Sequence, residues 1–294
     1  MRIVSTKVSE ITGIKNIPFF ECTGFGLANT LIPNSISFID DIAFLDELND
    51  NQNINVVFST KRIAEKVSKK TVLICQDPRF VFYSLYNKIN DDYYQKSPNQ
   101  IDKSAILHPN SFVEDYNVKI GKRSVIGPNV TILSDVEIGD ECIVQAGSVL
   151  GTEGFEFKRT SQGVLSVKHF GKVIIGNRVE IGANSTIDKG FTFRNTILGN
   201  DTKLDNHVHV AHAAQIGRGC FLTASSVVAG SCRIDDNVWL GPNSTISNQI
   251  VINEKASVSI GSVVTKNIKA NRKVTGNFAI DHFKFLKNQA AKKR

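Results

Sequence analysis

The sequence predicts a mainly β protein built on a left-handed parallel β-helix, and three observations support that prediction. Aliphatic residues recur at every sixth position throughout residues 198–264. Neither an α-helix, with 3.6 residues per turn, nor a plain strand, which alternates every two residues, produces that period. Turn-forming residues follow many of these positions, as in the run Ile-Gly-Lys-Arg-Ser-Val that starts at position 120. Six-residue repeats with tight corners are typical of a parallel β-helix, in which three short strands complete one triangular coil.

The same period occurs earlier in the chain, with two interruptions. It runs through residues 120–150 and resumes over residues 175–187. Residues 151–172 and 190–197 break it, and we expect both segments to leave the β-helix as extruded loops. Long excursions from a regular solenoid are usually functional.

The first 98 residues lack the period and predict a small α/β unit. Two apolar runs, residues 56–59 and 71–75, are expected to be buried strands. Asp77 is a suitable N-cap and Pro78 a suitable first residue for a helix that follows. Residues 91–100 are polar and predict a linker. The sequence therefore predicts domains at residues 1–98 and 99–268, and a basic segment at 269–294 with a short helix that caps the last coil.

Composition narrows the class of protein. The net charge of +7 favours an anionic partner, but no interleaving of aromatic and basic residues points to nucleic acid. No apolar run approaches the ~18 residues of a membrane helix, and the N-terminus has no apolar core of a secretory signal. The five cysteines form no CxxC pair, which favours a reducing cytoplasm over a disulfide framework.

His212 is the strongest candidate for chemistry. It is the third residue of its six-residue repeat, where a side chain points away from the core. One coil is 18 residues, so Gly230 is expected to stack on His212 and Asn248 to follow in the next coil. An imidazole of ordinary pKa near 6.5 suits removal of a proton from an amine, and the bare backbone of Gly230 offers an N–H to a developing oxyanion.

Two other interpretations of the histidines remain open. Any of them can be a solvated surface residue. The pattern His207, His209, His212 also resembles a zinc motif, but the three side chains occupy different positions in the repeat and should diverge. We therefore expect no metal at this site.

Several runs are similar to a known family. They are Val-Ile-Ile-Gly-Asn-Arg-Val-Glu-Ile-Gly-Ala-Asn-Ser-Thr-Ile-Asp-Lys-Gly from position 173, Gly-Thr-Glu-Gly-Phe from position 151, and the stretch ending Val-Ala-His at position 212. They resemble UDP-3-O-acylglucosamine N-acyltransferase, which performs the N-acylation step of lipid A synthesis. The resemblance implies a homotrimer with active sites between neighbouring β-helices. It also implies that His212 is the general base and that the Gly230 N–H stabilises the oxyanion. No covalent enzyme intermediate is needed, because the acyl thioester is already activated, and no bound cofactor is expected.

The resemblance also implies an acceptor site for a UDP- or dTDP-linked amino sugar. Phe38 and Phe44 match the rings that stack on the base, although both can instead be core residues. Asp41 falls where the family usually has Asn, so base selectivity can differ. The other candidate contacts to the acceptor are Phe155, His169, Asn206, His207, His209, Asn248 and Gln249.

Three departures leave the acyl donor open between acyl carrier protein and coenzyme A. Gln249 replaces a second histidine of the family, and most of the C-terminal helices are missing. Residues 257–268 look more like coenzyme-A-dependent sugar acetyltransferases, in which Gly261 and Lys266 would lie near the coenzyme. A short-chain N-acetyltransferase for O-antigen-type sugars is thus the first alternative. A zinc-dependent hydratase of the carbonic anhydrase type and a non-catalytic β-helix are the others.

Overall fold

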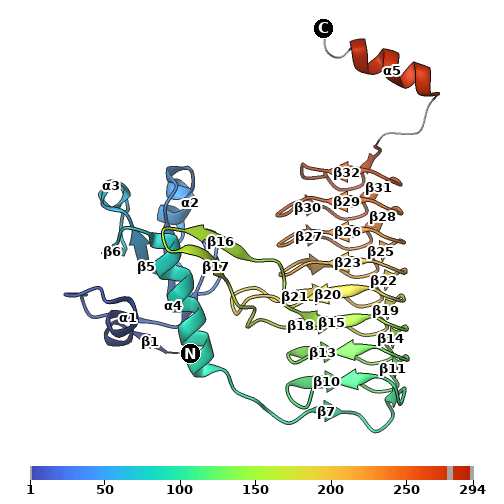
Figure 1. The fold of residues 1–294 in the computed structure, drawn as a ribbon, viewed down its shortest axis with the longest axis horizontal. Coiled ribbons are helices and arrows are strands. Elements are labelled where there is room, and N and C mark those ends of the chain that lie inside the picture. The colour runs from blue at the N-terminus through green and yellow to red at the C-terminus, as the bar shows by residue number, and fades with distance from the viewer. Residues whose placement is uncertain (1, 277–280, 292–294) are drawn as a thin grey trace.

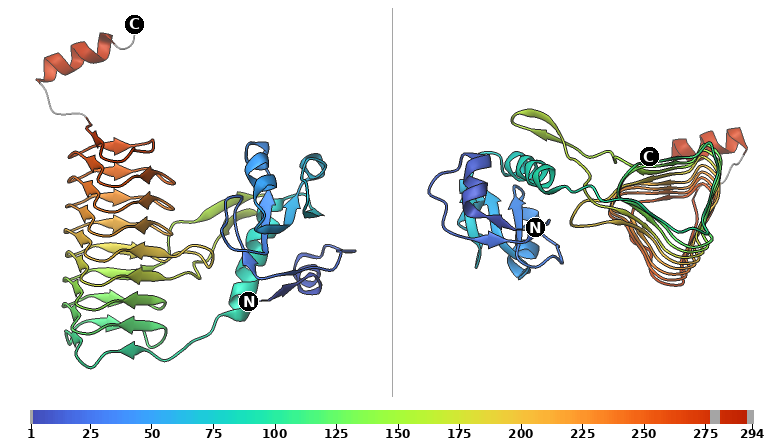
Figure 2. Two further views of the ribbon diagram at one scale, coloured as in Figure 1. Left: turned by 180° about the vertical axis from the view of Figure 1, so that it is seen from behind. Right: turned by 90° about the horizontal axis from the view of Figure 1, so that it is seen from below.

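The computed structural model describes residues 2–276 and 281–291, and it shows an N-terminal α/β unit beside a long β-helix (Figure 1). Three parallel sheets form the walls of the β-helix, and seen along its axis the coils make a triangle (Figure 2). The predicted left-handed parallel β-helix is confirmed. The basic residues Lys292, Lys293 and Arg294 of the predicted C-terminal segment lie outside the described residues.

Each wall is a stack of short strands, one from each coil. The first wall contains β7 (Gln100–Ile101), β10 (Val118–Ile120), β13 (Val136–Ile138), β18 (Val173–Ile175), β21 (Thr196–Leu198), β24 (Gln215–Ile216), β27 (Arg233–Ile234) and β30 (Val251–Ile252). The second contains β8 (Ile106–Leu107), β11 (Val125–Ile126), β14 (Ile143–Val144), β19 (Glu180–Ile181), β22 (Lys203–Leu204), β25 (Phe221–Leu222), β28 (Trp239–Leu240), β31 (Ser257–Val258) and β33 (Lys273–Val274). The third contains β9 (Phe112–Val113), β12 (Thr131–Ile132), β15 (Val149–Thr152), β20 (Thr186–Asp188), β23 (His209–Val210), β26 (Val227–Val228), β29 (Thr245–Ile246) and β32 (Val263–Val264).

The aliphatic residues that recur every six positions form the core of the β-helix. All the aliphatic positions that it marks from residue 198 to residue 264 are buried. Between residues 118 and 264, wherever no segment is extruded, each strand of the β-helix pairs with the strand 18 residues later, as His209 does with Val227 and Val227 with Thr245. One coil cannot bury its own aliphatic face, so each coil depends on its neighbours for a core.

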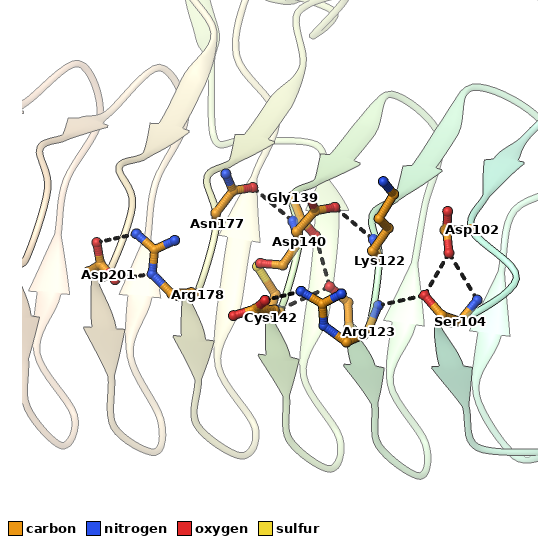
Figure 3. Close-up of polar contacts among 12 residues, drawn as sticks. Asp102, Ser104, Lys122, Arg123, Gly139, Asp140, Cys142, Asn177, Arg178 and Asp201 are labelled. Carbon is orange, nitrogen blue, oxygen red and sulfur yellow. Dashed lines mark hydrogen bonds and ion pairs between the residues drawn. The ribbon is translucent and has the colours of Figure 1, made fainter.

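The corners explain the polar residues between the aliphatic ones. One residue in most corners adopts a left-handed backbone, and from His207 to Lys255 such residues recur every six positions. Side chains then link successive corners, as Figure 3 shows for one edge of the early coils. Asn177 accepts a hydrogen bond from the Asp140 N–H at 2.8 Å, and Asp140 in turn accepts one from the Lys122 N–H at 2.7 Å.

The N-terminal unit is a four-stranded parallel sheet with flanking helices. Its elements are β1 (Ile3–Val4), α1 (Ser5–Thr12), β2 (Glu21–Cys22), β3 (Gly24–Phe25), β4 (Ser35–Ile39), η1 (Ile42–Phe44), α2 (Leu45–Asp50), β5 (Ile54–Ser59), α3 (Lys61–Ala64), β6 (Thr71–Ile74) and α4 (Pro78–Tyr93). The predicted helix cap is confirmed, because the Asp77 carboxylate accepts a hydrogen bond from the Phe80 N–H at 2.9 Å. The predicted linker begins too early, because α4 continues to Tyr93. Its last turns carry the buried Ile89 and Asn90, which anchor the helix to the unit.

The first extruded segment joins the two parts of the molecule. It forms an antiparallel hairpin, β16 (Phe157–Thr160) and β17 (Gly163–Ser166), that reaches α4. Asn87 of α4 donates to the Ser166 carbonyl at 2.8 Å, and the Ser161 N–H donates to Asp77 at 2.7 Å. Val167 and Phe191, from the two extruded segments, are buried in the same apolar cluster as the core of the N-terminal unit.

The predicted C-terminal helix forms as α5 (His282–Ala291), but it does not cap the β-helix. Phe283 and Leu286 are 72% and 48% exposed, and α5 lies beyond the last coil (Figure 1). The side chain of Phe285 lies outside the described set. Among the described helices, none has both the length and the apolar character that crossing a bilayer requires.

The stacked core predicts a sharp difference between inward and outward positions. Leu222→Ala, at a fully buried position, is expected to destabilise the protein by about 2–5 kcal/mol, because it removes apolar contacts and leaves a cavity. Lys269→Ala, at an exposed corner, is the control and should change stability by less than about 0.5 kcal/mol. Urea titration followed by circular dichroism measures both, and equal midpoints would contradict the assignment of the core.

Candidate functional site

His212 lies just after β23, at a corner of the β-helix, and Gly230 occupies the equivalent corner of the next coil. The register of β23 with β26 puts the two residues in one column. A Cβ atom placed on Gly230 would lie 2.5 Å from the Nε2 and Cε1 atoms of His212. Any side chain at position 230 would therefore collide with the imidazole, which lies against the bare backbone of Gly230. Within the described part of the chain, the Gly230 N–H donates to no other group.

The second extruded segment fixes the backbone of this column. Thr196 accepts a hydrogen bond from the Ala213 N–H at 2.8 Å. The guanidinium of Arg194 donates to the carbonyls of Ala213 at 2.8 Å and of Ser231 at 3.2 Å. Ala213 and Ser231 directly follow His212 and Gly230, so Arg194 holds both corners from one side. The sequence analysis did not identify Arg194, because its role depends on contacts across coils.

The base of the hairpin covers the His212 ring. Only 13% of the side chain is exposed, although the sequence predicted a ring facing outward. Glu156 lies 3.5 Å from His212, measured from Oε2 to Nε2, and Glu156 also pairs with Lys158. A Cβ atom on Gly154 would lie 2.6 Å from the His212 Cβ, so the covering chain can come this close only because residue 154 is glycine. The run Gly-Phe-Glu-Phe in the extruded loop was the available signal for Glu156.

The surroundings of His212 favour its neutral form. Burial is the largest influence and lowers its pKa, and the charges of His169 and Lys158 act in the same direction. Glu156 and Asp188 oppose them, but the net pKa lies below the ordinary value of 6.5. A neutral imidazole beside a free backbone N–H can accept a proton while the N–H stabilises negative charge on oxygen.

The remaining histidines of the motif diverge. His207 is the left-handed corner residue of its repeat, with φ of 59°, and is exposed. His209 points outward from β23, with its Nε2 3.8 Å from the buried carboxylate of Asp188. His169 is 2% exposed and packs close to His212, with ring centroids 5.4 Å apart. Among the described residues, no three His, Cys, Asp or Glu side chains come close enough together to hold a metal ion.

Other candidate residues lie along the same column or beside it. Asn248 and Gln249 are exposed at the corner one coil after Gly230. Lys266 occupies the position equivalent to Asn248 in the following coil. At ~4.8 Å per coil, Lys266 lies roughly 14 Å from His212 along the column. Gly261 is exposed at the preceding corner of the last coil.

Asn206 and Phe155 have different environments. The Asn206 side chain accepts a hydrogen bond from the Ala183 N–H at 2.7 Å, and so helps to build a corner. Phe155, at the base of the hairpin, is 83% exposed and contacts Phe157 edge to face, with ring centroids 5.0 Å apart.

The candidate base-stacking residues are not equivalent. Phe38 is partly buried and packs against Phe82 and Tyr83, with ring centroids 4.9 and 5.6 Å apart. Phe44 is 54% exposed. Asp41 caps η1 by accepting a hydrogen bond from the Ala43 N–H at 2.9 Å.

A hollow of about 440 Å³ adjoins Asp41. The residues that line it come from the N-terminal unit and the hairpin and are almost all charged: Asp40, Asp41, Ile42, Arg62, Asp77, Arg79 and Arg159. Arg79 and Asp40 form an ion pair across it at 2.9 Å. Neither Phe38 nor Phe44 is among the lining residues.

Comparison with known proteins is consistent with this geometry. Residues 117–152 match the family profile "Bacterial transferase hexapeptide (six repeats)", and residues 172–208 match "Hexapeptide repeat of succinyl-transferase". The UDP-N-acetylglucosamine acyltransferase from Campylobacter jejuni has the same fold, with a TM-score of 0.50 and 20% identity over 66% of this chain and 83% of its own. The chain therefore carries hexapeptide repeats of the kind found in these transferases and shares the β-helix fold.

Curated relatives narrow the class. UDP-3-O-acylglucosamine N-acyltransferase of Bordetella pertussis is 27% identical over 91% of this chain and 84% of its own length. The Wolinella succinogenes protein of the same name is 33% identical, but the alignment spans only 58% of this chain and about half of the relative, 53%. The chain is thus similar over most of its length to one curated UDP-3-O-acylglucosamine N-acyltransferase, and over more than half of its length to another of that name.

The burial of His212 leads to a prediction about its pKa that can be tested without substrate. We expect its ring to titrate below pH 6.5, because burial disfavours the imidazolium. Glu156→Gln should lower the midpoint further, because it removes the carboxylate that favours the charged form. NMR of histidine-labelled protein, with His212 assigned by its loss in His212→Gln, measures both. A midpoint at or above 6.5, or an increase in Glu156→Gln, would contradict this account.

Proposed function

We propose that this protein is an N-acyltransferase that moves an acyl group from a thioester to the amine of a nucleotide-linked amino sugar, in lipid A or surface glycan synthesis. The observation that carries the proposal is the column of His212 and Gly230. A neutral imidazole lies against the bare backbone of Gly230, whose N–H has no partner in the described part of the chain. This pair suits a reaction that releases a proton and develops an oxyanion.

In this reaction the chain supplies positioning and proton transfer. His212 accepts the proton of the amine as the C–N bond forms, and the Gly230 N–H stabilises the oxyanion of the tetrahedral intermediate. The C–S bond then breaks and the proton passes to the leaving thiolate. No covalent intermediate on the enzyme is needed, since holding an activated thioester next to the amine supplies much of the rate.

We assign the acceptor to the side of the column that faces the N-terminal unit. Residues 1–98 bind the nucleotide, with Phe44 as the more accessible stacking ring and Phe38 behind it. Arg62, Arg79 and Arg159 suit a diphosphate in the adjoining hollow, and Asp41 lies at its edge. Contacts to the sugar are assigned to Phe155, Asn206, His207 and His209. His169 is buried and is assigned no contact to the sugar.

We place the acyl donor along the C-terminal part of the column, within residues 99–268. Asn248 and Lys266 occupy the corners equivalent to Gly230 in the next two coils, and Gln249 follows Asn248. Gly261 lies at the preceding corner of the coil that carries Lys266. We favour a lipid-A-type reaction over a short-chain variant that uses a coenzyme A thioester, which Gln249 and the sequence of the last coil keep as the alternative. The basic segment 269–294, with Lys287 exposed in α5, suits either acidic donor.

A homotrimer completes the proposed site. The second wall carries an exposed pair, Phe221 and Trp239, each 44% exposed with ring centroids 5.8 Å apart. Such a pair suits an interface between copies of the chain. All five cysteines are free, which supports our assignment of the protein to the cytoplasm.

The role of His212 is tested by substitution. His212→Ala is expected to lower turnover by about 10²–10⁴-fold with the fold intact, the usual contribution of a general base. His108→Ala, at an exposed histidine in the first coil, is the matched control and should leave turnover unchanged. Turnover by His212→Ala close to that of the original protein would remove the assigned role.

The substrates are tested by a product assay. Purified protein is offered UDP- and dTDP-linked amino sugars together with acyl-CoA of several chain lengths or acyl carrier protein. Mass spectrometry should detect an amide product whose mass increases by one acyl group. Product from acetyl-CoA alone would favour the short-chain alternative, and absence of product from every pair would contradict the proposed function.

A further inference from the structure

A second buried imidazole lies next to His212 and has its own carboxylate. The His169 Nδ1 atom is 3.0 Å from Oε2 of Glu153, and the His169 backbone N–H donates to the same oxygen at 2.9 Å. The ring stacks on Phe191, with centroids 4.6 Å apart and planes inclined by 24°. The hydrogen bond at Nδ1 and the stacking contact thus fix the orientation of the His169 ring, and the backbone hydrogen bond holds Glu153 in place beside it.

The state of Glu153 is settled by its neighbours. Partial burial works against its ionisation, but the hydrogen bond from His169 and the charge of Lys189 outweigh that effect and lower its pKa to about 2. Lys189 lies 3.0 Å from the other carboxylate oxygen. Glu153 is therefore a carboxylate at any pH at which the protein functions, and it accepts the Nδ1–H of His169.

His169 presents its other nitrogen toward the covered site. A Cβ atom on Gly154 would lie 2.8 Å from Nε2 of His169 and equally close to Cδ2 of His212. Only the bare backbone of Gly154 fits between the two rings. In the described part of the chain, the buried Nε2 of His169 has no hydrogen-bond partner.

Protonating both of two imidazoles this close costs free energy, because like charges in a desolvated site repel each other. The two rings have unequal carboxylate neighbours. His169 has a hydrogen bond to Glu153, whereas Glu156 approaches His212 only to 3.5 Å and is also paired with Lys158. Asp188 is turned toward His209 and Thr152.

We propose that His169, held by Glu153, is a positioning residue that carries the proton of this imidazole pair and leaves His212 free to accept one. The proposal rests on the acyl-transfer function proposed above. His169 need not touch the substrate, since it acts by keeping His212 neutral and fixing the cover over it. Each imidazole thus has a carboxylate nearby, but the two pairs differ in geometry. That difference makes one imidazole the charged partner and leaves the other as the neutral base.

The order of protonation tests the proposal without any substrate. In histidine-labelled protein, with rings assigned from single His→Gln variants, His169 is expected to take up a proton before His212 as the pH is lowered. The measurement uses the unaltered chain, so it remains decisive even if a variant fails to fold. Protonation of His212 first would overturn the proposal.

The pH dependence of kcat/KM tests the consequence for catalysis. The acid limb of the profile reports protonation of His212. In His169→Gln, loss of the neighbouring charge should move this limb upward by about half a pH unit or more, equal to a roughly threefold loss well below the midpoint. On the alkaline plateau the variant should stay within about threefold of the original protein.

The control and the outcomes separate the possibilities. His108→Gln should leave the profile unchanged. A uniform loss at every pH with an unmoved midpoint would mean that His169 is only structural, and would overturn the proposal. If no acyl transfer is detected but the NMR titration shows the expected order, the proposed function fails while the relation between the two histidines stands.

Discussion

The vertical pairing of each coil with the next is the constraint on which the rest of the structure depends. Between residues 118 and 264, each strand residue of the β-helix pairs with the residue 18 positions away, or farther where a segment is extruded. The pairing leaves no freedom to slide, since a shift by one residue would turn the aliphatic positions toward water. A residue and its equivalent in the next coil are thereby held about 4.8 Å apart, which is how Gly230 comes to support the His212 ring.

A regular column would leave this ring in open solvent, and the two extruded segments change that. The first brings Gly154 and Glu156 over the ring, and the second supplies Arg194 beneath its corner. The same segments hold the N-terminal unit against the β-helix through the cluster that contains Val167 and Phe191. One set of contacts therefore encloses the catalytic candidate and positions the unit to which we assign nucleotide binding.

Enclosure has a direct chemical consequence. Removing water from an imidazole disfavours its charged form, and so prepares a base that is unprotonated at neutral pH. The same loss of water strengthens the electrostatic interactions between nearby groups. The site must therefore balance the interactions among Glu153, Glu156, His169 and Lys158 within a small volume. Their arrangement in unequal pairs gives the two histidines different tasks although both are buried.

Much of the fold was fixed by periodicity alone. An aliphatic residue at every sixth position can be buried in only one way, so the sequence determined the β-helix and the column of His212 and Gly230. The residues Asp77 and Pro78 likewise determined the helix cap. The sequence also marked the segments that leave the solenoid. It did not reveal where those segments go, because their contacts join residues far apart in the chain. Glu153 and Arg194 carried no local signal, and Glu156 was marked only by the run Gly-Phe-Glu-Phe in the extruded loop. His212 was expected to be more open than it is. Only the tertiary structure could decide these features, since burial and the proximity of charges depend on which distant segments share a volume.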